Sequence, residues 1–84
     1  MYFRLDLKKN EDDSLVKIKE GFISPDRINL GSQLLIGHWG DEYQTGKIVM
    51  YIHDPVTNIW EFLTSDDMYY ILTPIENTDE KQIH

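Results

Sequence analysis

Hydrophobic and polar residues alternate one by one over much of the chain, which is the period of a β-strand with one buried face. The clearest example is YFRLDLK, residues 2–8, where Phe3, Leu5 and Leu7 share one face and charged residues occupy the other. LVKIKEGFI, residues 15–23, repeats the alternation after the polar turn KNEDDS. These two segments therefore predict a β-hairpin at the start of the sequence.

Three more segments with strand character follow a connection that contains proline and glycine. Ser24 precedes Pro25 and is therefore biased away from helix, whereas Pro25 itself suits the first position of a single helical turn. The predicted strands are residues 33–39, 47–54 and 58–64, and the turns between them are short enough for hairpins.

The segment after the last of these strands has two interpretations. Ser65 suits a helix N-cap, and the two aspartates that follow it suit the first turn of a helix, so we expect a short helical turn here. An edge strand over residues 71–75 should follow the turn. The alternative is a strand in place of the helical turn, and the sequence leaves open which of the two forms residues 65–73 take.

These elements predict a mainly β fold, with α+β as its variant. We expect a twisted antiparallel meander of about five strands, or a half-barrel, with one or two short helices. At 84 residues the chain is long enough for a single small domain, which we place at residues 1–75, with a polar C-terminal tail over 76–84.

The core is expected on one face of the hairpin formed by the 47–54 and 58–64 strands. Centring this hairpin on Val56 puts five large apolar side chains on the same face, with Trp60 the largest. They are Ile48, Met50, Ile52, Trp60 and Phe62.

The amino-acid composition excludes some kinds of site and favours strands over helices. The chain has no cysteine, which excludes disulfides and thiolate metal sites, and no alanine, whose absence favours strands over helices. No apolar run approaches the roughly 18–20 residues that a membrane span requires, and the first residues do not resemble a signal peptide. We therefore expect a cytoplasmic protein without membrane contact.

The net charge of −7 is unevenly distributed. Residues 1–27 hold six bases and six acids, whereas residues 28–84 hold only Lys47 and Lys81 against nine acids. Such a surface repels phosphate backbones and argues against direct nucleic-acid binding, but it speeds association with a basic partner protein. The ordinary alternative is that the charge serves solubility alone.

The stretch GHWGDEYQTG, residues 37–46, holds the most candidate chemistry, but no catalytic, metal or cofactor site follows from it. With the preceding hairpin centred near Tyr43, His38 and His53 would stand about 16 Å apart and could not share an ion. Asp41 and Glu42 are adjacent, so on an extended chain their carboxylates point to opposite sides and do not converge on one bond.

The same stretch does suit protein binding. Aromatic residues on loops are favoured anchors in interfaces, and acids around them can bind a basic target. The predicted contact residues are Trp39 and Tyr43 as anchors, with Asp41, Glu42, Asp66 and Asp67 supplying charge. The ordinary alternative is that Trp39 folds back over the small core.

The run KIVMYIHDPVTNIWEFLTSDD resembles a pattern in small bacterial immunity-type proteins, in which a short acidic turn leads into a Trp-x-Phe strand and then a small acidic stretch. The matching residues are Ile52, Asp54, Trp60, Phe62, Leu63, Asp66 and Asp67. ISPDRI, residues 23–28, is similar to a segment that precedes the central strands of such proteins. The resemblance covers about half the chain, and this sequence lacks the acid-dense segment that such proteins would have after Trp60. The resemblance implies a protein that neutralises a toxin by binding it.

The leading expectation is a small acidic inhibitor of a basic partner, of immunity type or encoded by a phage. Two other classes stay open. One is a small-ligand sensor or an enzyme built on the half-barrel, using His38 and Tyr43. The other is a structural subunit of a homo-oligomer, for which a homodimer is the simplest form.

Overall fold

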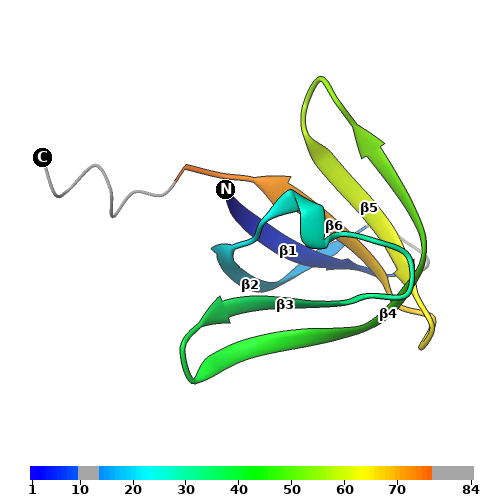
Figure 1. The fold of residues 1–84 in the computed structure, drawn as a ribbon, viewed down its shortest axis with the longest axis horizontal. Coiled ribbons are helices and arrows are strands. Elements are labelled where there is room, and N and C mark those ends of the chain that lie inside the picture. Colours follow the sequence, from blue (N-terminus) through cyan, green and yellow to red (C-terminus); the bar gives the residue numbers. More distant parts are fainter. Residues whose placement is uncertain (10–13, 77–84) are drawn as a thin grey trace, which may run out of the picture.

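The computed structural model describes residues 1–9 and 14–76, and strands dominate them (Figure 1). The strands are β1 (Tyr2–Lys8), β2 (Leu15–Phe22), β3 (Gln33–His38), β4 (Asp41–Asp54), β5 (Ile59–Thr64) and β6 (Tyr69–Pro74). A single 3-10 turn, η1 (Pro25–Arg27), begins at the proline that predicted it. The mainly β fold is therefore confirmed, with six strands in the described part where about five were expected. The predicted tail lies outside the described residues from residue 77 onward.

All six strands form one antiparallel sheet in the order β2-β1-β6-β5-β4-β3. The sheet curls until its two edge strands, β2 and β3, meet and nearly close a barrel (Figure 1). Gly21 on β2 and Gly37 on β3 make the closest approach, since a Cβ added to Gly21 would lie 2.6 Å from the Gly37 backbone nitrogen. The ion pair between Lys19 Nζ and Asp41 Oδ1, 3.0 Å long, crosses the same seam.

The core fills the inside of this curl. Its buried apolar side chains come from β1, β3, β4, β5, β6 and the connection around η1: Phe3, Leu5, Ile23, Ile28, Leu34, Ile36, Ile48, Trp60, Phe62, Tyr70 and Leu72. The rings of Phe62 and Tyr70 stack at its centre, with centroids 5.3 Å apart. Ile23 and Ile28 lie on either side of η1, so this connection covers part of the core that the strands leave open.

The predicted helical turn after β5 and the edge position of the last strand are both wrong. Residues 65–67 form a turn in which Asp67 takes a left-handed φ of 63°, and the backbone N–H of Ser65 donates to the Lys47 carbonyl. β6 then pairs with β1 on one side and β5 on the other. Tyr70 and Leu72 alternate into the core, and this burial outweighs the local preference for a helix cap.

The β3–β4 hairpin turns earlier than the sequence predicts. Its register pairs His38 with Asp41, so the turn is the dipeptide Trp39–Gly40 and not a loop centred near Tyr43. Gly40 has a φ of 79°, a backbone position that glycine adopts without strain. β4 therefore begins at Asp41, and the polar residues expected in a loop form the first half of a 14-residue strand.

The β4–β5 register also differs from the expected one. A bulge between Ile48 and Met50 inserts one residue, after which the faces of β4 are exchanged. Ile48 stays in the core with Trp60 and Phe62, as predicted. Met50 and Ile52 instead point outward and are exposed, so their assignment to the core is wrong.

Candidate functional site

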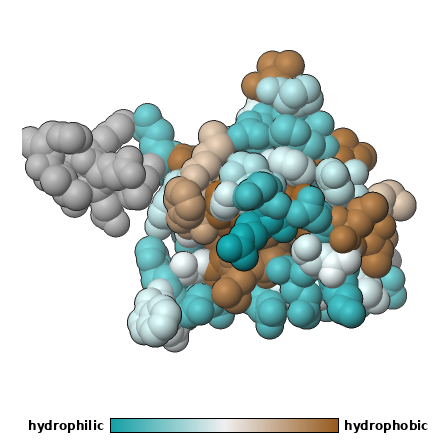
Figure 2. Space-filling model, in the orientation of Figure 1, coloured by the Kyte–Doolittle hydropathy of each residue, from teal (hydrophilic) through white to brown (hydrophobic). Residues whose placement is uncertain are grey.

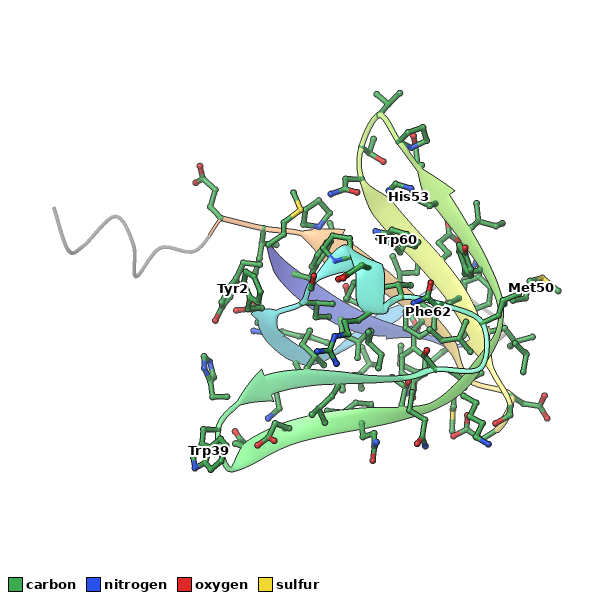
Figure 3. All side chains as sticks on the ribbon, in the orientation of Figure 1. Tyr2, Trp39, Met50, His53, Trp60 and Phe62 are labelled. Atoms are coloured by element: carbon green, nitrogen blue, oxygen red, sulfur yellow. The ribbon has the colours of Figure 1, made fainter. Side chains whose placement is uncertain are left out.

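The tip of the β3–β4 hairpin carries the most exposed aromatic residue among the described residues. Trp39 is 99% exposed and projects away from the barrel (Figure 3). The two-residue turn causes this, since at position 39 the chain has left the ladder and no neighbouring strand covers the indole. The alternative that Trp39 folds back over the core is therefore wrong.

Two carboxylates adjoin Trp39 and hold the tip in shape. The backbone N–H of Gly40 donates to Glu42 Oε1 at 2.6 Å, which closes the turn on itself. Asp41 forms the seam ion pair with Lys19, yet most of its side chain stays in contact with solvent. Trp39, Asp41 and Glu42 therefore form one exposed group, called the tip group below.

Tyr43 does not belong to the tip group. Its side chain points inward, its ring packs against the core, and its hydroxyl lies 2.7 Å from the Tyr70 hydroxyl. The two rings meet edge to face with centroids 6.2 Å apart. Burial, and then the bond to Tyr43, raises the pKa of Tyr70 well above its ordinary value. Tyr43 thus supports the core and is not available as an exposed anchor.

Asp66 and Asp67 lie in the β5–β6 turn, away from the tip group. The Thr64 hydroxyl donates to Asp66 Oδ1, and this carboxylate sits beside Gly46 on β4. Gly46 is five residues along β4 from Asp41, a distance of about 16 Å at strand spacing. The six predicted contact residues therefore separate into the tip group, the inward Tyr43 and the acidic turn.

An aromatic stack on the β4–β5 hairpin was not predicted. The His53 and Trp60 rings stack with centroids 3.9 Å apart, and His53 Nε2 lies 2.7 Å from Asn58 Oδ1 (Figure 3). Trp60 Nε1 is buried without a hydrogen-bond partner. The shifted register creates the stack, because His53 now stands opposite Trp60 and not opposite Ile59. Assigning the β4 residues to the two faces of the sheet with the bulge included would have predicted this His53–Trp60 stack.

A groove of about 550 Å³ opens where β2 and β3 diverge next to η1. Its walls are apolar and polar side chains with one charged group: Phe22, Ile23, Ser24, Arg27, Ser32, Gln33, Leu34, Leu35 and Gln44. No acidic residue and no histidine is among them, and neither His38 nor Tyr43 reaches it. The two residues on which the sensor or enzyme alternative depends therefore do not line this groove.

Among residues 1–9 and 14–76, no three His, Asp or Glu side chains lie close enough together to hold a metal ion. Over the same residues, no helix has the length and apolar character needed to cross a membrane.

The fold and the tip group together define a small, nearly closed antiparallel β-barrel that presents an exposed tryptophan beside two acids. Comparison of the chain with protein-family models, with curated proteins and with solved structures gave no match. The functional argument therefore depends on the geometry of the chain itself.

Proposed function

We propose that this protein is a small acidic protein-binding module that inhibits or shields a basic partner protein, with the tip group at the centre of the contact. The exposed indole of Trp39 carries the proposal. Burying a large aromatic side chain removes about 150–250 Å² from water, which amounts to about 4–6 kcal/mol before the costs of association. A side chain held in water at a two-residue turn is a ready anchor for a pocket on a partner.

The charges around the tryptophan favour a basic partner. Asp41 and Glu42 flank the anchor, and the net charge of the chain is −7. Acids at the rim of an interface steer a basic partner and raise the association rate, an effect that salt weakens. Membrane insertion of Trp39 is disfavoured, because anionic lipid headgroups repel the same two carboxylates.

The acidic turn gives the partner a second contact. An ordinary interface buries about 800 Å² on each side, which corresponds to a patch roughly 30 Å across. Such a patch spans the distance of about 16 Å between Asp41 and the β5–β6 turn. With the tip group at the centre, such a patch reaches about 15 Å in each direction, so in this proposal Asp66 and Asp67 lie at its edge.

In its specific form the proposal is an immunity-type or phage-encoded inhibitor acting in the cytoplasm. It would work by steric and electrostatic occlusion of a basic enzyme, such as a toxin nuclease. Nothing in this mechanism requires a catalytic group, a metal or a cofactor on the inhibitor. The protein would cover the positive surface that the enzyme uses for its own substrate.

Affinity capture from a lysate of the native host, with nuclease added, tests the proposal. We compare the wild-type chain with Trp39→Ala, with Asp41→Lys/Glu42→Lys, and with Val56→Ala as the matched control. Val56 is 90% exposed in the β4–β5 turn, at the other end of β4, so its truncation removes apolar surface away from the tip group. The expected result is a basic protein, identified by mass spectrometry, that only the control and the wild-type chain retain.

Moderate salt should weaken this capture, and the wild-type chain should inhibit the purified partner in a direct assay of the partner's activity. A partner that all four chains retain equally would contradict the role of the tip group. A partner whose affinity does not respond to salt would contradict the electrostatic part.

A further inference from the structure

The second half of β4 is an open sheet edge. β3 accompanies β4 only as far as Lys47, and the connection before β3 then bonds to Ile48 through Gly31 N–H and the Ser32 carbonyl. Beyond that point, residues 50–53 pair with β5 alone, and Val49 is the bulge residue that has no partner in the β4–β5 register, as far as the described residues extend. No described strand lies along the other side of this part of β4 (Figure 1).

This edge is apolar. Val49 is 51% exposed, Met50 60% and Ile52 63%, and residues 48–53 include no Asp, Glu, Lys or Arg. Figure 2 shows apolar residues gathered on the same side of the molecule, over β4. Sheet proteins ordinarily protect such an edge with charges, prolines or covering segments, because an unpaired apolar strand is a template for another strand. Here the bulge at Val49 is the only such feature within the segment.

We propose that a second copy of this chain occupies the edge, so that two β4 strands pair antiparallel about a two-fold axis. A two-fold axis perpendicular to the sheet keeps each face of the sheet on its own side, so the residue on the axis must face its own copy. With Tyr51 on the axis, Met50 lies opposite Ile52 of the second copy, and Ile52 lies opposite its Met50. Both contacts are apolar pairs on the outer face, and cross-strand pairs of this kind stabilise sheets.

The neighbouring registers are less favourable. Centring on Met50 would place Ile52 opposite Ile48, whose backbone groups are already bonded to Gly31 and Ser32. Centring on Ile52 would place Met50 opposite the charged Asp54, and Val49 opposite a proline that has no N–H. Only the axis at Tyr51 pairs Met50, Tyr51 and Ile52 with one another without counting through the bulge at Val49.

Charge complementarity favours an antiparallel pair of copies. Lys47 and Asp54 lie at opposite ends of the open segment, so the two-fold axis brings Lys47 of each copy to the end that holds Asp54 of the other, one position from direct opposition. Two copies of a chain with charge −7 repel at long range, and added salt screens that repulsion. Self-association should therefore strengthen with salt, opposite to the binding of a basic partner at the tip group. The inference goes beyond the proposed function and uses a different surface.

Cysteine cross-linking tests the register directly, because the chain contains no native cysteine. In the proposed pair, Tyr51→Cys faces its own copy with Cβ atoms about 4.5–5.5 Å apart, close enough for a disulfide after a small shift. Val56→Cys is the matched control, since it is more exposed but lies outside the pair. Under mild oxidation we expect Tyr51→Cys to form a covalent dimer at least about tenfold faster.

Sedimentation of the wild-type chain provides a test that needs no substitution. The expected result is a monomer–dimer equilibrium that shifts toward dimer from low to high salt, and that Ile52→Glu weakens about tenfold. A wild-type chain that stays monomeric at high salt and high concentration would overturn the proposal. Equal cross-linking of Tyr51→Cys and Val56→Cys would overturn the register.

Discussion

Closure of the barrel at Gly21 predicts that Gly21→Ala destabilises the fold. The added methyl group would lie 2.6 Å from the Gly37 backbone nitrogen and 3.0 Å from its Cα, whereas ordinary contacts begin at 3.4 Å. Both atoms belong to the backbone of β3 and cannot rotate away. The substitution must therefore separate β2 from β3 along the seam that the Lys19–Asp41 ion pair crosses.

Two opposing effects set the size of the loss. At a position with ordinary backbone angles, Gly→Ala stabilises a protein by about 0.4–1 kcal/mol through the unfolded chain. Forcing packed elements apart costs about 1–3 kcal/mol. The overlap at Gly21 outweighs the gain, and we expect the free energy of unfolding to fall by about 1–2 kcal/mol. For a domain of this size, that lowers the Tm by roughly 4–16 °C.

Thermal and urea unfolding followed by far-UV circular dichroism measures this change. Gly46→Ala is the matched control, because the three atoms nearest to its methyl group belong to the end of the Asp66 side chain, which can shift at the expense of one hydrogen bond from Thr64, and none belongs to the backbone. We expect the control to lie within about 0.5 kcal/mol of the wild-type chain. A Gly21→Ala chain as stable as the wild type would refute the close approach of β2 and β3.

Two further predictions concern the tyrosines. Tyr43→Phe leaves the buried Tyr70 hydroxyl without its partner, so the free energy of unfolding should fall by about 1–3 kcal/mol. The double variant Tyr43→Phe/Tyr70→Phe should lose less than the sum of the two single variants, as measured by urea unfolding in a double-mutant cycle. The hydrogen bond to Glu61, and then burial, raises the pKa of Tyr69 from 10.0 to about 12. The folded chain therefore holds this proton more tightly than the unfolded chain, so its contribution to stability is complete below pH 10 and is lost as the pH rises toward 12. Tyr69→Phe should flatten the decline of the urea midpoint over that range, and an unchanged slope would contradict the assignment.

Local alternation predicts the segments in which one strand face is buried. Phe3 and Leu5 in β1, and Trp60 and Phe62 in β5, enter the core as their spacing indicates. The first half of β4 was missed because its polar side chains resemble a loop. Thr45 shows why they form a strand, since its Oγ1 accepts a hydrogen bond from the Leu34 N–H across the ladder. A contact between residues 11 positions apart leaves no local pattern.

The bulge in β4 explains the other error in the core. One inserted residue exchanges the two faces of a strand, so counting by twos fails from that point onward. Met50 and Ile52 therefore point outward, and Tyr51 and His53 join the face of Trp60. The residues directly before and after the bulge are apolar, so the pattern of apolar and polar residues alone does not show where the register changes.

The candidate site was predicted in part for a similar reason. The glycines around Trp39 indicated a turn, but its position decided which aromatic residue is exposed. With the turn at Trp39–Gly40, the alternation along β4 sends Glu42 and Gln44 outward and Tyr43 toward Tyr70, whereas Asp41 is exposed because it adjoins the turn. A turn placed at Tyr43 would have exposed that ring instead. The register of one hairpin thus separates the anchor from the core residue.

The two proposed surfaces follow from how this short chain uses its strands. A single sheet of six strands nearly closes on itself at Gly21 and Gly37, but the 14-residue β4 is much longer than the six-residue β3 and β5 beside it. The unmatched length has two consequences. One end of β4 extends with β3 into the hairpin that exposes Trp39, and the other end leaves residues 49–53 as an open edge. The first surface is flanked by acids, whereas residues 49–53 of the second include no Asp, Glu, Lys or Arg and must overcome the repulsion between two chains of charge −7. Salt should therefore weaken contacts at the hairpin tip and strengthen contacts at the edge. A salt titration that follows partner binding and self-association in the same sample therefore assigns each interaction to its surface.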